Sequence, residues 1–119
     1  MWVRFHDSTP DDPDLDRLSD GAFRVYFASI CYSQRNQTDG VITANQAARS
    51  VPKCRPAYLK ELTANPFDHE DGPLFRELSS GVYVIRNFAK YQGTSQGWAA
   101  KKQADAERQA EWRRKREEG

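Results

Sequence analysis

The basic side chains of this 119-residue chain are its most chemically suggestive groups, because they gather in two places. Between residues 35 and 60, five basic residues stand against a single aspartate, a local charge of +4. A second run of four cations follows near the C-terminus, at residues 113–116. Lysine and arginine neutralise phosphates and release counterions from nucleic acid, so both groups are candidates for phosphate contacts. A solvated helix end, with Glu111 and Lys115 paired four residues apart, is the alternative interpretation of the second group. The cations concerned are Arg35, Arg49, Lys53, Arg55, Lys60, Arg113, Arg114, Lys115 and Arg116.

The acidic and metal-ligating residues predict no comparable chemistry. Five aspartates lie within residues 7–16, but their spacing lacks the glycine and the distal glutamate of a calcium-binding loop. His6, His69, Cys31 and Cys54 lack the closely spaced pairs that zinc sites use. No glycine-rich phosphate loop and no nucleophile elbow is present in the sequence. We therefore expect a protein that is not an enzyme, with no metal and no cofactor, and a solvated acidic connector at 7–16.

Composition limits the architecture that can carry these residues. The chain is 38% hydrophobic and 29% charged, which fits one small domain with a polar appendage and excludes a large enzyme scaffold. Its net charge of +1 makes charge distribution more informative than total charge. Two cysteines are too few for a disulfide framework, and no apolar run has the length of a membrane span or the layout of a signal peptide. We expect a soluble, cytoplasmic protein.

Alternation and cap signals predict the elements of the first half of the chain. Residues 2–5 alternate apolar and polar β-formers, which predicts a short strand that pairs with a later hairpin. Residues 20–37 predict a long amphipathic helix, followed by a turn at 38–40 and a minimal strand at 41–42. Thr43 is expected to cap a short helix through residue 50. The helix stripe and the expected aromatic core are Phe23, Tyr26, Phe27, Ile30, Tyr32, Trp2 and the other phenylalanines.

Proline positions organise the second half. A turn is predicted at 51–54, and Pro56 in the first helical position predicts a helix over 55–64 with Leu59 and Leu62 facing inward. A polar loop at 67–73 leads to a β-hairpin of residues 74–78 and 82–86, with a three-residue loop at 79–81. Glycines then predict a flexible joint at 93–97, followed by a charged, alanine-rich helix from Trp98 to the C-terminus.

This order of elements predicts an α+β winged helix-turn-helix, in which three helices pack together beside a small antiparallel sheet. The charged C-terminal helix follows that domain. The predicted organisation is therefore a winged-helix domain at 1–92, then the joint and the charged helix at 93–119.

Several segments resemble one known family at this point. The sequence is similar to the N-terminal winged-helix domain of replication-initiation proteins from actinobacterial phages and prophages, over roughly residues 2–112. The loop at 65–73 departs from the family, which has a short glycine-containing link there. The segments that carry the resemblance are RLSDGAFR at 17–24, ASICYS at 28–33, TDGVI at 38–42, GVYVIRNF at 81–88 and KYQ at 90–92.

The resemblance implies DNA binding in phage replication initiation or in the control of phage genes. In a helix-turn-helix, the second short helix enters the major groove, here residues 55–64. The helical period places Ala57, Lys60, Glu61 and Ala64 on its outward face. The expected DNA contacts are Lys53, Arg55, Ala57 and Lys60 on double-stranded DNA, flanking phosphate contacts from Arg35, Arg49 and Arg76 or Arg86, hairpin-tip contacts from Ser79 and Ser80, and phosphate contacts from Arg113, Arg114, Lys115 and Arg116.

A protein-interaction module is the alternative that the sequence leaves open. Tryptophan is enriched at the centres of protein interfaces, and Trp98 and Trp112 stand in a helix without an apolar stripe. Together with the acidic segment at 7–16, they would dock a host or replisome protein. Packing of the two tryptophans back on the winged-helix domain is the competing interpretation. Oligomeric state and target sequence are not predicted.

Overall fold

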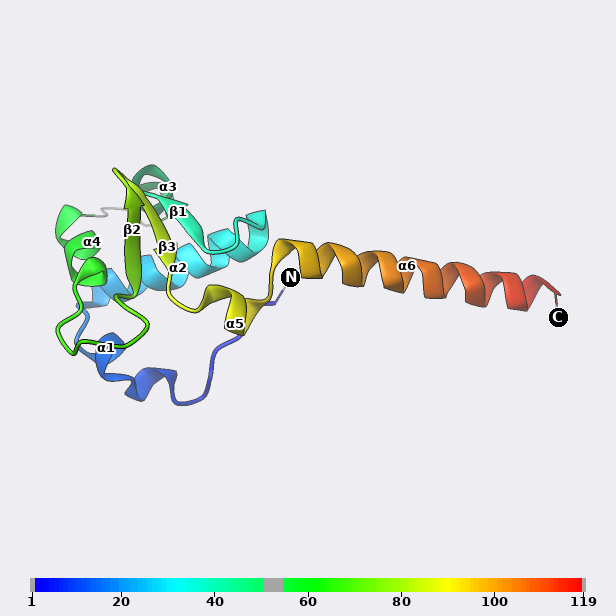
Figure 1. Cartoon of the computed structure of the whole chain (residues 1–119), viewed down its shortest axis with the longest axis horizontal. Helices are drawn as coiled ribbons and strands as arrows, with labels where there is room; N and C mark the ends of the chain where they lie inside the picture. Colours follow the sequence, from blue (N-terminus) through cyan, green and yellow to red (C-terminus); the bar gives the residue numbers. More distant parts are fainter. Residues whose placement is uncertain (1, 51–54, 119) are drawn as a thin grey trace.

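The computed structural model describes residues 2–50 and 55–118 and has an α+β architecture, with a small antiparallel sheet and a long C-terminal helix (Figure 1). Helix α2 lies at the centre of the globular part and packs against α3, α4 and the first strand. The elements are the 3-10 helix η1 (Thr9–Asp11), α1 (Pro13–Asp16), α2 (Asp20–Asn36), β1 (Val41–Thr43), α3 (Ala44–Ser50), α4 (Pro56–Thr63), β2 (Phe75–Ser79), β3 (Val82–Ile85), α5 (Phe88–Gln92) and α6 (Ser95–Glu118).

The predicted long helix is confirmed as α2, but its buried face differs from the predicted stripe. The Ser19 hydroxyl caps the helix by accepting from the Ala22 N–H at 3.2 Å. Phe23 and Phe27 are 41% and 47% exposed, so their assignment to the core was wrong. Ile30 of the predicted stripe is buried and Tyr26 packs against the core, so that part of the prediction is confirmed. Small residues beside them let neighbouring elements approach closely. The fully enclosed residues of α2 are Ala22, Val25, Ser29, Ile30, Ser33 and Gln34.

The short elements after α2 form as predicted where the structure describes them. Strand β1 occupies 41–43, and α3 opens with a capping box in which Thr43 and Gln46 each accept from the other's backbone N–H. Helix α4 starts at Pro56, with Leu62 fully buried and Leu59 half-buried. The turn predicted at 51–54, with Lys53 and Cys54, lies outside the described residues.

The hairpin of β2 and β3 completes a three-stranded sheet in the order β1-β3-β2. Ser79 pairs with Val82, so the connection is tighter than the predicted three-residue loop and leaves only Ser80 and Gly81 between the strands. Gly81 has a φ of 74°, a conformation that glycine adopts without a steric penalty. A register shift between Glu77 and Ser79 accommodates the short turn.

The N-terminal segment is not a strand, which corrects the prediction for residues 2–5. Its backbone is held by side-chain amides: Arg4 donates its N–H to Gln92 Oε1 at 2.8 Å, and Gln92 Nε2 donates to the Arg4 carbonyl at 2.6 Å. Gln34 Nε2 donates to the Trp2 carbonyl at 3.1 Å. These bonds satisfy the backbone as a neighbouring strand would. Trp2 itself is 86% exposed and lies outside the core, contrary to prediction.

The segment at 7–16 is more than a solvated connector. Asp14 is only 3% exposed, and its Oδ2 accepts from Arg86 Nη1 at 2.9 Å across 72 positions of sequence. Arg17 Nε lies 3.8 Å from the other Asp14 oxygen. A buried carboxylate needs such partners to remain charged. Arg86 is therefore a structural ion-pair residue and is not placed for the phosphate contact considered for it.

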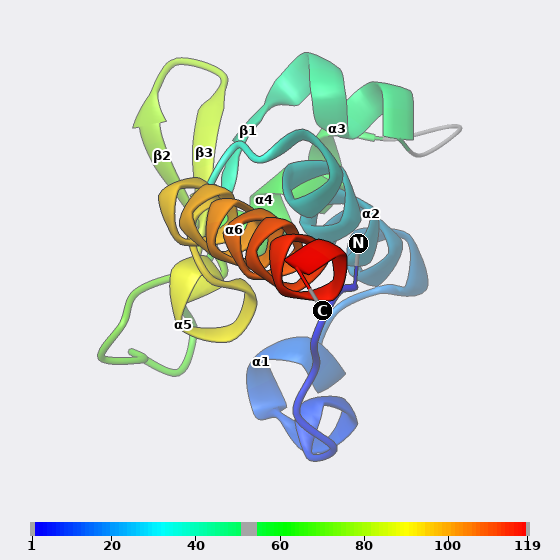
Figure 2. The same ribbon diagram turned by 90° about the vertical axis from the view of Figure 1, so that its right-hand side faces the viewer.

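Helix α6 begins at Ser95, inside the joint predicted at 93–97. Asp39 caps it, because its two carboxylate oxygens accept from Ser95 N at 2.6 Å and from Ser95 Oγ at 2.7 Å. From there the helix leaves the globular part as a single rod, which Figure 2 shows nearly end-on. Within residues 2–50 and 55–118, no helix has both the length and the apolar character needed to cross a lipid bilayer.

Candidate nucleic-acid interface

The candidate recognition helix α4 is fixed to the start of α2 by a close steric contact. Gly21 lies in the first turn of α2, and a Cβ atom added there would stand 2.2 Å from Cζ of Tyr58. Only a residue without a side chain allows the Tyr58 ring to lie this close to the α2 backbone. The contact sets the distance between the two helices.

Two polar contacts hold the other parts of α4. The Glu61 carboxylate accepts from the Ser19 N–H at 2.8 Å and from the Ser19 hydroxyl at 2.7 Å. Arg17 Nη2 donates to the carbonyl of Ala64, just after the last turn of α4, at 3.1 Å. Glu61 places negative charge at the N-terminus of α2, and Arg17 places positive charge at the C-terminus of α4, so each charge complements a helix dipole.

Glu61 therefore does not lie on the outward face of α4, where the helical period placed it. Its carboxylate turns toward α2, while Lys60, Ala57 and Ala64 remain exposed. The prediction failed because counting residues around a helix does not reveal which neighbour lies beside it. Lys60 is therefore the charged residue on the outward face of α4, and the neighbouring Glu61 carboxylate is engaged by Ser19.

Four of the cations predicted to contact DNA are exposed, whereas Arg86 is held in its ion pair with Asp14. Arg35, Arg49, Arg55 and Lys60 all lie at the surface, and within the described ranges none of them forms an ion pair. Unpaired surface cations remain available to an anionic partner. Lys53 lies outside the described residues.

The hairpin tip and α3 are joined by a backbone hydrogen bond from Ala44 N to the Gly81 carbonyl at 2.9 Å. Ser79 and Ser80 are exposed at this tip, and Arg76 is exposed farther down β2. The tip of the hairpin thus presents the hydroxyl groups of Ser79 and Ser80, and Arg76 is the cation of β2 that precedes them.

The C-terminal cations do not join this surface. Figure 1 shows α4 and the end of α6 at opposite ends of a molecule that measures 63 Å along its longest axis. Lys115 pairs with Glu111 at 3.7 Å, and the Arg116 guanidinium lies 5.2 Å from the centre of the Trp112 ring. Arg113 and Arg114 are exposed. The two groups of cations are therefore two separate surfaces.

The two tryptophans of α6 differ in their surroundings. Trp98 is half-buried at the base of the helix, and its indole N–H donates to the Gln92 carbonyl at 2.8 Å. Trp112 is 61% exposed near the far end. Trp98 thus anchors α6 to α5, and Trp112 is the one that faces solvent.

Sequence reasoning missed the roles of Arg17 and Gly21 and placed Glu61 on the wrong face, although all three hold α4. In the sequence these residues look like parts of a helix cap or like common helix residues, so nothing marks them as contacts between helices. Only the packing of α2 on α4 reveals their roles. Among the side chains that the structure describes, no three His, Cys, Asp or Glu residues come together as metal ligands would. Comparison with protein-family models, with curated proteins and with solved structures finds no match for this chain.

Proposed function

We propose that the protein is a winged-helix DNA-binding protein that places α4 in the major groove of double-stranded DNA. The order α2-β1-α3-α4-β2-β3, with β3 central in the sheet, is the order expected of a winged helix-turn-helix. The resemblance to phage replication-initiation domains extends the proposal to replication initiation or gene control in a phage or prophage.

The observation that carries the proposal is the charge on the exposed side of α4. Glu61, the only acidic residue of the helix, is withdrawn into its contact with Ser19. Arg55 at the N-cap and Lys60 one turn later remain exposed, with the small residue Ala57 between them. An α-helix with its side chains is about 10–12 Å across, which fits the width of about 12 Å of the major groove. Small and cationic residues together favour a close approach to DNA.

The proposal is tested by fluorescence anisotropy with a labelled DNA duplex over a range of salt concentrations. The variant Arg55→Ala/Lys60→Ala should bind more weakly, with a salt slope shallower by about 1.8, because each phosphate contact contributes about 0.9. The control Arg24→Ala/Lys90→Ala removes the same charge from exposed positions of α2 and α5. Equal losses in both variants, or no duplex binding at low salt, would refute the role of α4.

Docking of a host or replisome protein is the second candidate, and exposed aromatic residues favour it. Phe23 and Phe27 follow one side of α2, and Phe5 stacks on Phe27 with ring centres 5.6 Å apart. Trp2 and Trp112 are exposed as well. Exposed aromatic groups of this size are typical of interaction surfaces. Binding through them would depend little on salt, which distinguishes this candidate from DNA binding.

A further inference from the structure

The projecting part of α6 gathers positive charge around one tryptophan. From residue 99 to residue 117, every residue is exposed apart from the partly buried Asp105. Residues 108–116 hold five basic residues and a single acidic one, a local charge of +4. Trp112 lies among these cations and is 61% exposed. A large aromatic ring left in water at this place is available for stacking by a ligand.

The neighbours of Trp112 on the surface of the helix are all polar. In an α-helix, the side chains three and four positions away from a residue lie on the same face. For Trp112 these are Arg108, Gln109, Lys115 and Arg116, three of them cations. We call these four residues and Trp112 together the Trp112 face.

The cations of the Trp112 face are accessible to phosphate. The Arg116 guanidinium lies 5.2 Å from the centre of the Trp112 ring, and within residues 2–50 and 55–118 it forms no ion pair. Lys115 pairs with Glu111 at 3.7 Å. Arg108 pairs with Asp105. All four side chains of these two pairs are between 45% and 76% exposed. Exposed ion pairs are weak, so a phosphate can replace either carboxylate.

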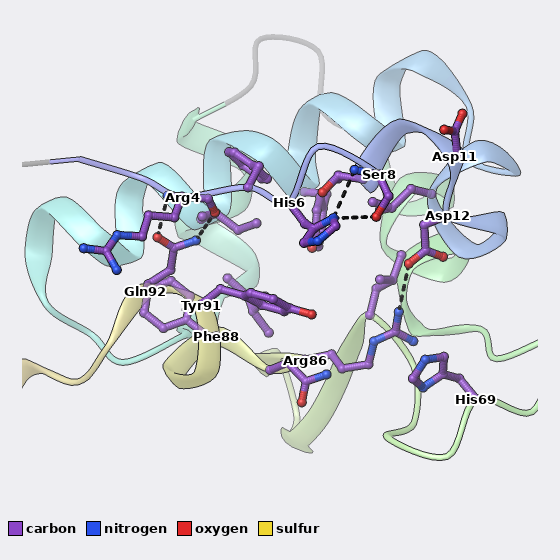
Figure 3. Close-up of a pocket in the computed structure, with 18 of the residues that line it drawn as sticks. Arg4, His6, Ser8, Asp11, Asp12, His69, Arg86, Phe88, Tyr91 and Gln92 are labelled. Carbon is purple, nitrogen blue, oxygen red and sulfur yellow. Dashed lines mark hydrogen bonds and ion pairs between the residues drawn. The ribbon is translucent and has the colours of Figure 1, made fainter.

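Trp98, at the base of α6, has a different role. Its indole N–H donates to the Gln92 carbonyl at 2.8 Å. Figure 3 shows the side chain of the same glutamine bound to the backbone of Arg4, so Gln92 joins α6 to the N-terminal segment. Trp98 therefore fixes the base of the helix, whereas the Trp112 face lies at the end that points away from the globular part (Figure 1).

We propose that the Trp112 face binds single-stranded nucleic acid. One base stacks on the Trp112 ring. Arg108, Lys115 and Arg116 contact the phosphates on either side of that base. Every base has a π-face, so such stacking tolerates any sequence. The site uses no residue of α4 and therefore does not rest on the function proposed for that helix.

The polar surroundings of the ring favour this partner over a protein. The centre of a protein–protein interface is depleted in charged residues, whereas three cations surround Trp112. A DNA duplex would also attract these cations, but its bases are stacked and paired inside the double helix and offer no face to the ring. An unpaired strand offers both phosphates and free base faces.

The test is fluorescence anisotropy of the full chain with a labelled oligothymidine of about 20 nucleotides, longer than one site of this kind. Trp112→Leu should weaken binding about tenfold, because it removes one stacked base. Trp112→Phe keeps an aromatic ring and should stay within about threefold of the unmodified chain. Trp2→Leu removes a tryptophan that is 86% exposed on the globular part and should leave affinity unchanged. No binding at low salt, or equal losses in Trp112→Leu and Trp2→Leu, would overturn the proposal.

A pair of arginine variants tests the face of the helix. Arg116→Ala should make the salt slope for oligothymidine shallower by about 0.7, the contribution of one phosphate contact on a single strand. Arg114→Ala removes the same charge from the same end of α6, but position 114 lies about 160° around the helix from Trp112. Its slope should therefore change little. Equal changes in the two variants would show that the charge of the helix end acts without the Trp112 face, and the proposal would be wrong.

Other probes distinguish the partners. Polyglutamate carries negative charge without bases and should bind about tenfold more weakly than oligothymidine, so equal binding would contradict stacking. The Arg55→Ala/Lys60→Ala variant should bind oligothymidine as the unmodified chain does. A loss of that binding would place the single strand on α4 and refute the present proposal, whereas a failure of duplex binding alone would refute only the role of α4.

Discussion

The contact between Glu61 and Ser19 yields the sharpest prediction for stability. Replacing Glu61 with alanine removes both hydrogen bonds to the carboxylate, one from the Ser19 N–H and one from its hydroxyl. Hydrogen bonds to charged groups contribute about 1.5–3 kcal/mol each when sheltered from water. Glu61 is only half-buried and Ser19 is exposed, so solvent screening reduces the pair to about 1–2 kcal/mol in total.

The assay is urea unfolding followed by far-ultraviolet circular dichroism. The Glu61→Ala variant should lose about 1–2 kcal/mol of unfolding free energy, a decrease in Tm of about 4–12 °C for a domain of this size. Glu70→Ala serves as the control, because Glu70 is exposed in the loop before β2 and has no described partner. A double-mutant cycle with Ser19→Ala should show a coupling energy of about 1 kcal/mol between the two side chains.

The same residue also tests the surface charge of α4. Glu61→Gln removes the negative charge and preserves shape, so DNA affinity should stay within about twofold if the carboxylate faces α2 and not the DNA. The reasoning is refuted if Glu61→Ala costs no more than Glu70→Ala, or if Glu61→Gln strengthens DNA binding about tenfold. Either result would place the carboxylate on the outward face of α4.

Three further predictions concern other contacts. Gly21→Ala should destabilise the fold by about 1–3 kcal/mol in urea unfolding, since its Cβ would overlap Tyr58, and a neutral or stabilising effect would show that the ring moves away freely. Gln92→Ala should release residues 2–5, so the Arg4 amide should exchange with deuterium much faster, and unchanged protection would contradict the two amide bonds. Burial raises the pKa of Tyr26 above 10.0, which favours the neutral phenol in the folded state. The stability it contributes is therefore present below pH 10 and lost as pH rises through the folded pKa, and Tyr26→Phe should remove a phenol transition above pH 10 in an absorbance titration.

The sequence predicts the start of a helix well when the residues that cap it lie close together in the chain. Ser19 and Ala22 define the start of α2, and Thr43 and Gln46 define the start of α3, within three residues in each case. Pro56 likewise marks the first turn of α4. A cap or a turn needs no knowledge of the rest of the chain, so sequence alone suffices for it.

Long-range partners explain what the sequence could not predict. Residues 2–5 have the alternation of a strand, but the Gln92 amide, 88 positions away from Arg4, satisfies their backbone instead. The Asp14–Arg86 pair likewise joins residues from opposite parts of the chain. Phe23, Phe27 and Ile30 share one side of α2 by helical spacing, yet only Ile30 of the three is buried, because the elements that pack against α2 cover that side over part of its length. The spacing of apolar residues identifies one face of a helix, but it does not show which other element packs against that face.

The capping of α6 by Asp39 has a mechanical consequence. Among the residues that the structure describes, the helix meets the globular part at its N-terminal end, where Ser95 bonds to the turn before β1 and Trp98 bonds to α5. A tilt of about 10° at Ser95 would move the far end by about 6 Å, because a helix of 24 residues is about 36 Å long. A small change of angle at Ser95 would therefore be amplified at the basic end of the helix. The Asp39 carboxylate is the contact that holds the start of the helix in its present direction.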